Sequence, residues 1–383
     1  MRVVTNEKLG AVCQSMKDRG VDVALVTDFE RKRDTSLRYL SGLPTDAELL
    51  LFSDGYTILI PWDQELAGKM AQANEMLNVL EFDRSYRRAR THALTSRLGR
   101  TFALEVMPNE SYYEVSKIRE EFPDVNIICD PRGAGYAISR ARRVKEQHEI
   151  DIIREGCLQT DKLIDMISPF VQDHPECREI DLALFLETEM RKLGAEKPGF
   201  ETLVANAERS AQIHTYPTAS TDPLTKQGLA LIDFGIVWNG YTTDVTVPMV
   251  FGDLNPTQQR MIDMVQKVHD TAISSIAPGV PAHEIAAEAI GTLTAQGLNM
   301  PYSLGHGIGL EVHEGPLLGL KPKDPSALKD WVETPLEAGM LFTIEPGCVD
   351  SEHGGTRLED DVLVTATGVE VLTSSRLLRF PSH

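Results

Sequence analysis

LALIDFGIVWNGYTTDVTVPMV, residues 229–250, is the stretch that decides the fold. Asn239-Gly240 at its centre is among the strongest short signals for a β-hairpin, because both residues accept the positive φ angles of a tight turn. The pairs that this turn predicts are Trp238 with Tyr241, Asp233 with Thr246, and Gly235 with Asp244. Asp233 and Asp244 then project from one face as diagonal neighbours, about 7–8 Å apart.

This acidic pair within an apolar hairpin has two interpretations. Two carboxylates at that spacing can converge on a pair of metal ions about 3.5–4 Å apart. Antiparallel sheets also commonly have one solvated face, on which aspartates need no special role. The hairpin alone does not decide between a metal site and a wet surface.

Two downstream runs add further carboxylates. The stretch MLFTIEPG (340–347) ends an apolar run with Glu345. In TRLEDDVLVT (356–365), strand alternation puts Arg357, Glu359 and Asp361 on one face. Taken alone, this second run is better interpreted as an edge strand protected by charge.

Histidines supply the other donors. YSLGHGIGLEVHEGP (302–316) holds His306 and His313 among glycines that allow close backbone approach, and its spacing is not the dinucleotide-binding G-x-G-x-x-G. His214 closes the strand-like run SAQIHTYP. Each of these histidines, considered singly, fits an ordinary loop residue.

The chain is predicted to form two domains, residues 1–135 and 136–383, because 383 residues exceed one ordinary core. The first domain is expected to be a small α/β unit with helices over 5–20 and 109–121, strands over 22–27 and 126–130, and a hairpin over 47–61. The second is expected to have helices over 144–170, 179–194, 256–276 and 281–296, with strands over 200–206, 228–237, 241–250, 340–345 and 357–365.

Composition excludes some classes of partner. A formal charge of −19 repels phosphate backbones and anionic lipid, which argues against nucleic acid and membrane as main partners. The N-terminus lacks the apolar run of a signal peptide. Five scattered cysteines, with no CxxC pair, fit a reduced compartment. We therefore expect a cytoplasmic protein.

The order of these motifs is more specific than any one of them. LIDFG and GYTTDVT, then GHGIGLEVHEGP, then TIEPG, then RLEDDVLVT resemble the methionine aminopeptidase, prolidase and creatinase superfamily, and the prolidase and proline-specific aminopeptidase branch most closely. The resemblance implies an α+β protein. Its C-terminal domain would have the pita-bread fold, an antiparallel sheet flanked by two helix pairs, behind a smaller N-terminal α/β domain. Relatives also suggest a homodimer.

The resemblance assigns a role to each candidate residue. It implies metal ligands at Asp233, Asp244, His306, Glu345 and Glu359. It implies catalytic residues at Glu345, which would shuttle a proton, at His214 and His313, which would contact substrate, and at Arg357. Departures from the family pattern fall on the substrate side, among them Ala207, Arg209, Ile213, Val247 and Gly315-Pro316-Leu317.

The activity implied is that of a metallopeptidase. Two divalent cations, with Mn²⁺ or Co²⁺ expected before Zn²⁺ or Fe²⁺, would activate a bridging hydroxide that attacks the peptide bond preceding proline, in a dipeptide or at an N-terminus. One alternative is a pita-bread hydrolase or lyase acting on a small non-peptide metabolite. Another is a non-catalytic peptide-binding module.

Overall fold

The computed structural model describes residues 4–381, which divide into two compact units between Arg142 and Arg143. The domain boundary that the sequence predicts, between residues 135 and 136, lies inside helix α6 (Ala134–Arg143) and stays a prediction. Among the described residues, no helix is both long enough and apolar enough to cross a membrane.

The first unit is built on a six-stranded sheet in the order β4-β3-β2-β1-β5-β6. Its strands are β1 (Val23–Asp28), β2 (Ala47–Phe52), β3 (Thr57–Pro61), β4 (Glu75–Met76), β5 (Ala103–Val106) and β6 (Asn126–Ile128). The predicted hairpin over 47–61 is confirmed, since β2 and β3 pair antiparallel around Asp54-Gly55.

Helices accompany this sheet. They are α1 (Asn6–Asp18), α2 (Thr35–Ser41), α3 (Gln64–Met70), the 3₁₀ helix η1 (Val79–Phe82), α4 (Tyr86–Leu98), α5 (Tyr112–Glu121) and α6. The predicted helices over 5–20 and 109–121 correspond to α1 and α5. The sequence did not predict α4, because its buried apolar side chains are only Ala89, Ala93 and Leu94, too few to form a recognisable stripe.

The second unit has two helix pairs. They are α7 (Gln147–Asp173) with α8 (Glu179–Leu193), and α9 (Pro256–Ser274) with α10 (Ala282–Ala295). A short helix, α11 (Pro325–Leu328), follows. Local chemistry sets their ends: Asn255 caps α9 with Pro256 in its first turn, and Gly194 closes α8 in the left-handed conformation. The four predicted helices are thus confirmed.

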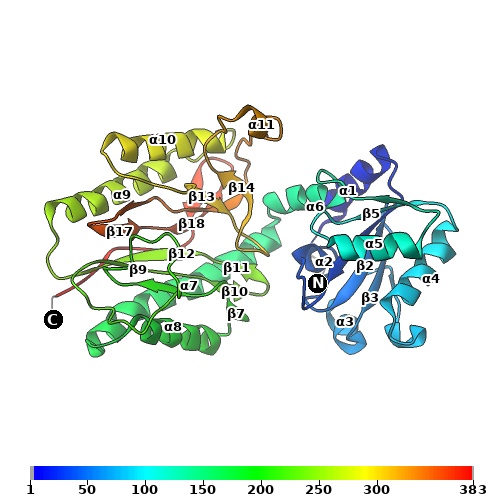
Figure 1. Cartoon of the computed structure of the whole chain (residues 1–383), viewed down its shortest axis with the longest axis horizontal. Helices are drawn as coiled ribbons and strands as arrows, with labels where there is room; N and C mark the ends of the chain where they lie inside the picture. Colours follow the sequence, from blue (N-terminus) through cyan, green and yellow to red (C-terminus); the bar gives the residue numbers. More distant parts are fainter. Residues whose placement is uncertain (1–3, 382–383) are drawn as a thin grey trace. The chain divides into compact units, whose positions relative to one another are not determined.

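Strands fill the space between these helix pairs (Figure 1). One sheet has the order β20-β12-β9-β8 and another the order β14-β13-β15-β18-β19, with smaller sheets β11-β10-β7 and β16-β17. The strands are β7 (Lys197–Pro198), β8 (Leu203–Ala205), β9 (Gly228–Phe234), β10 (Ile236–Trp238), β11 (Tyr241–Thr242), β12 (Val245–Phe251), β13 (Gly305–Gly307), β14 (Glu314–Leu318), β15 (Leu341–Ile344), β16 (Gly347–Asp350), β17 (Gly354–Arg357), β18 (Asp360–Val364), β19 (Val369–Val371) and β20 (Leu378–Phe380).

Two apolar cores hold these layers together. One joins α7 and α8 to β9 and β12, and the other joins α9 and α10 to β15 and β18. A bridge between Thr246 of β12 and Glu359 connects the two main sheets. Side chains that leave the sheets near this bridge lie between the two cores, which is where the candidate site forms.

The predicted hairpin keeps its register but is interrupted. Trp238 pairs with Tyr241 and Asp233 with Thr246, as predicted. Phe234 pairs with Val245 and Val237 with Thr242, so Gly235 and Asp244 fall opposite each other in the predicted register. The ladder itself is interrupted at these two residues, between β9 with β12 and β10 with β11. At the break, the Thr243 carbonyl lies so close to Gly235 that an added Cβ would meet it at 1.8 Å. Only glycine fits this approach.

Gly235→Ala is therefore expected to destabilise the protein by at least about 2 kcal/mol, since the clash is with backbone and cannot relax by a rotamer change. Chemical denaturation measures the effect. The matched control is Gly291→Ala in α10, where nothing lies within 4 Å of an added Cβ. That change should leave stability unchanged or raise it by up to about 1 kcal/mol. Equal effects of the two substitutions would contradict the close approach at Gly235.

Candidate metal centre

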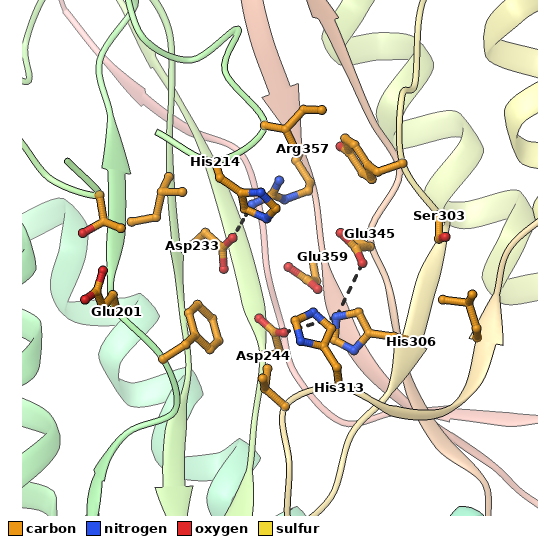
Figure 2. A pocket seen from close by; sticks show the side chains of 17 residues that line it. Glu201, His214, Asp233, Asp244, Ser303, His306, His313, Glu345, Arg357 and Glu359 are labelled. Carbon is orange, nitrogen blue, oxygen red and sulfur yellow. Dashed lines mark hydrogen bonds and ion pairs between the residues drawn. The ribbon is translucent and has the colours of Figure 1, made fainter. Parts of the chain in front are cut away.

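The eight residues that the sequence singled out line one cavity of about 430 Å³ in the second unit (Figure 2). They are His214, Asp233, Asp244, His306, His313, Glu345, Arg357 and Glu359. They come from segments up to 145 positions apart in the chain, so their meeting is a property of the fold. The interpretation of the hairpin aspartates as residues of a wet surface is wrong, because Asp244 is only 5% exposed.

Each carboxylate stands where a strand ends or is interrupted. Asp233 is the penultimate residue of β9, Asp244 directly precedes β12, and Glu345 directly follows β15. Glu359 lies in the two-residue gap between β17 and β18. Such positions let a side chain turn into the cavity without breaking a long ladder of hydrogen bonds.

The run 356–365 differs from its prediction in two ways. It was expected to be one strand, but β17 ends at Arg357 and β18 begins at Asp360. The interpretation of this run as an edge strand protected by charge is also wrong. Arg357, Glu359 and Asp361 are at most 6% exposed, and β18 lies between β15 and β19. Alternation still holds across the gap, since Arg357 and Glu359 both line the cavity.

His306 stands among the carboxylates. Its Nε2 lies 3.5 Å from Asp244 Oδ2 and 3.6 Å from Glu345 Oε1. Donor atoms of Asp244, His306 and Glu359 all lie within 4.8 Å of one another, a grouping that can hold a metal ion. Gly305 makes this placement possible, because an added Cβ there would meet the Thr343 carbonyl oxygen at 1.9 Å. One imidazole and four carboxylates form a hard, oxygen-rich donor set suited to divalent cations.

Arg357 connects two of the carboxylates. Its Nη2 donates to Asp233 Oδ2, and its Nε donates to Thr246 Oγ1 at 2.8 Å. Thr246 Oγ1 in turn donates to Glu359 Oε2 at 2.6 Å. The guanidinium therefore orients Asp233 directly and Glu359 through the threonine hydroxyl. Figure 2 shows it behind His214, with its dashed line to Asp233.

The charges in this cavity are unbalanced. Burial raises the pKa of Asp233 to about 6, against the lowering effect of Arg357. Burial, followed by repulsion from Glu359, holds the pKa values of Asp244 and Glu345 well above the ordinary range. Four carboxylates face one guanidinium, so the site disfavours its own negative charge until a further cation is added.

The surroundings of His306 and His313 favour the neutral form of each ring. Burial lowers the pKa of His306, and burial with repulsion from His306 and His214 lowers that of His313. The rings of His306 and His313 lie 4.1 Å apart between centroids. A neutral imidazole has a free lone pair for a metal or one N–H for a substrate. His214 lies on an exposed loop at the cavity.

Ile213 and Leu317, two of the departures expected on the substrate side, line the cavity. Sequence reasoning missed the other lining residues, which are Phe200, Glu201, Leu203, Thr218, Tyr302, Ser303 and Val312. Tyr302 lies beneath Arg357, with the guanidinium carbon 5.8 Å from its ring centroid. Its position directly before the SLGHG run was the one available signal. The others carry no chemical pattern and are brought to the cavity by tertiary packing alone.

The profile of metallopeptidase family M24 matches residues 151–366, more than half of the chain. The chain belongs to metallopeptidase family M24. This confirms the superfamily that the motif order indicated. The matched residues contain Asp233, Asp244, His306, Glu345 and Glu359, and they hold almost all of the second unit.

Relatives of this M24 peptidase extend the similarity to the whole chain. An Xaa-Pro dipeptidase of Pyrococcus furiosus is 29% identical over 373 residues, which cover 96% of this chain and 98% of that protein. The structure of a prolidase from Pyrococcus horikoshii has a TM-score of 0.80 at 27% identity, covering 97% and 99%. An Xaa-Pro dipeptidase from Bacillus anthracis has a TM-score of 0.83 at 26% identity, covering 98% and 99%. The predicted pita-bread and α/β architecture is thereby confirmed.

The donor chemistry of this M24 peptidase fits the divalent metal that its family implies. Within residues 4–381, the buried Oδ1 of Asp233 has no hydrogen-bond partner. Buried polar atoms are rarely left unsatisfied without a reason such as an ion. A cation bound here would give Asp233 Oδ1 a partner and would balance the surplus negative charge of the site. The role of each residue remains a prediction.

Proposed function

We propose that this M24 peptidase cleaves the peptide bond preceding proline, in a dipeptide or at the N-terminus of a longer peptide. The relatives named above act as Xaa-Pro dipeptidases or prolidases, and their similarity spans nearly the full length of both chains. The observation that carries the proposal is the gathering of four largely buried carboxylates and three histidines, all within the region that matches the family, around one cavity.

Asp233, Asp244, His306, Glu345 and Glu359 would hold two divalent cations, with Mn²⁺ or Co²⁺ expected first. When bound, the cations supply Lewis acidity and a water of lowered pKa. Arg357 prepares this set, because its bonds to Asp233 and Thr246 keep two carboxylates in place before any cation arrives.

The remaining steps belong to side chains. Glu345, largely buried and with its pKa raised, is the group that would take up a proton at a carboxylate oxygen and return it to the departing nitrogen. His313, neutral beside His306, would donate an N–H to the substrate carbonyl oxygen as negative charge develops there. His214, on its exposed loop, would contact substrate from the mouth of the cavity.

A substrate panel tests the proposal. The protein, saturated with Mn²⁺, is given Xaa-Pro dipeptides, the matching Xaa-Ala dipeptides and longer Xaa-Pro peptides, and free proline and new N-termini are quantified. We expect release from Xaa-Pro substrates at least about a hundredfold faster than from Xaa-Ala, and loss of activity with a chelator. Stoichiometric metal with no peptide cleavage would favour an enzyme for a small non-peptide metabolite. A protein that binds peptide but no metal would be a binding module.

Metal binding should depend on pH in a definite direction. Because the pKa of Asp233 is raised to about 6, the metal-free folded chain binds more protons than the unfolded chain between about pH 4 and pH 6. Its stability contribution at this site therefore falls as the pH rises through that window. Cations replace those protons. We expect Mn²⁺ to raise Tm more at about pH 7.5 than at about pH 5, and an equal rise at both would contradict this.

A further inference from the structure

The first unit contains a second cavity, of about 770 Å³, larger than the candidate metal centre. Side chains from β1, β2, α4 and α5, and from the loop after β1, line it. Nothing in the proposed peptidase chemistry uses these residues, which all lie between Leu25 and Glu121. Cavities of this size with a few buried polar groups are typical of small-molecule sites.

Buried charges lie at one wall of this cavity. Glu48 is only 4% exposed, and Arg90 Nη1 donates to its Oε1 at 2.5 Å. Arg90 Nη2 donates to Glu121 Oε2 at 2.6 Å. Among the described residues, the other carboxylate oxygen of Glu48 has no hydrogen-bond partner, and neither has the hydroxyl of Tyr86. Glu48 and Tyr86 both line the cavity, so a ligand there is well placed to supply the missing partner.

The balance of charge indicates the sign of that ligand. Three carboxylates are nearly fully buried, those of Glu48, Glu110 and Glu121, with side chains 3–7% exposed. Two cations contact them closely: Arg90 and Lys32, whose Nζ lies 2.7 Å from Glu110 Oε2. Arg87 approaches Glu121 only at 3.9 Å, and its side chain is 67% exposed. Because Arg90 is shared by Glu48 and Glu121, these three carboxylates have two close cations among the described residues, and burial raises the pKa of Glu48. A buried charge that is incompletely compensated is costly, so a further cation would be favoured here.

Aromatic rings stand beside these carboxylates. Phe29 and Tyr86 meet edge to face, with their centroids 4.9 Å apart. Tyr113 lines the same cavity and is 65% exposed. The faces of aromatic rings attract organic cations, and they also bury an apolar body. Carboxylate and ring faces together are the recognition elements of an ammonium group on an apolar frame.

We propose that this cavity binds a small organic ammonium ion, with its ammonium group paired to Glu48 and its apolar body against Phe29 and Tyr86. The site is separate from the candidate metal centre, whose residues all belong to the second unit. Primary amines of the size of benzylamine are the probes that match this chemistry.

Isothermal titration of the Mn²⁺-saturated protein tests the proposal. We expect one benzylamine per chain, with benzoate and benzyl alcohol binding at least about tenfold more weakly, because only the ammonium offers the missing charge. Glu48→Gln keeps the shape and removes the charge, and should weaken benzylamine binding about tenfold or more. The matched control is Glu201→Gln, at the candidate metal centre, which should leave that affinity unchanged.

A second variant guards against misfolding. If thermal melting shows that Glu48→Gln no longer folds, Tyr86→Phe decides. We expect it to weaken benzylamine binding about tenfold or more, because the ammonium group loses the Tyr86 hydroxyl oxygen as a hydrogen-bond acceptor. Benzoate binding as tightly as benzylamine would overturn the proposal. So would unchanged benzylamine binding in the folded variants, or a loss of binding in Glu201→Gln equal to that in Glu48→Gln.

Discussion

Asp244→Asn is expected to reduce bound metal to at most one ion per chain and to lower peptidase activity at least about a hundredfold. Loss of an outer-shell partner of a metal ligand already costs about 10–100-fold, and loss of a ligand itself should cost more. Asparagine keeps the shape of Asp244 but removes one of the charges that the cations would neutralise. Metal analysis of the dialysed variant, with kcat/KM on an Xaa-Pro dipeptide, measures both effects.

The matched control is Asp253→Asn. Asp253 is exposed and lies two residues beyond β12, whereas Asp244 directly precedes the same strand. It should retain full metal content and activity. If Asp244→Asn bound two ions as tightly as the unmodified protein, Asp244 would not be a ligand, and the proposed arrangement would have to be abandoned.

Glu345→Gln should lower kcat about 10²–10⁴-fold with a much smaller change in KM, the effect expected when a general acid–base group is lost. The glutamine oxygen can still occupy the place 3.6 Å from His306 Nε2, so the geometry is largely kept. The assay is run at saturating Mn²⁺, and metal content is measured on the same sample. This separates loss of a proton carrier from loss of a ligand.

Glu337→Gln is the control for this prediction. Glu337 is exposed and lies before β15, whereas Glu345 lies after the same strand. Its kcat should equal that of the unmodified protein. A Glu345→Gln variant with full metal content and normal kcat would rule out the proton-shuttle role, while leaving the metal centre itself intact.

Local sequence was sufficient for the register of the hairpin. An Asn-Gly turn and the two-residue period of a strand together specify which residues oppose each other, so the pairing of Asp233 with Thr246 followed without tertiary information. The helices of the second unit were also predictable, because α7 and α9 carry long apolar stripes and α9 has a recognisable cap.

Local sequence was insufficient for the break in that hairpin. At the break, the N–H of Thr243 still donates to the Ile236 carbonyl, but the Ile236 N–H donates to Thr243 Oγ1 and not to its carbonyl. The same hydroxyl lies 2.8 Å from Thr160 Oγ1 of α7. The freed N–H of Asp244 donates to Asp361 Oδ2 at 3.1 Å, a partner 117 positions away. Both contacts are long-range, and no local pattern at 243–244 indicates them.

By itself, the sequence determined the family, the order of the candidate ligands and the strand face on which each aspartate lies. These depend on residue identity and on short-range periodicity, and both can be read from the amino-acid sequence. Only the tertiary structure decided that Arg357 reaches Asp233 and Thr246, and that Arg357, Glu359 and Asp361 are buried. It also decided that Glu48 lines a cavity with one oxygen that has no hydrogen-bond partner within residues 4–381. Burial and long-range contact arise when distant segments pack together, and both are set by which surfaces meet.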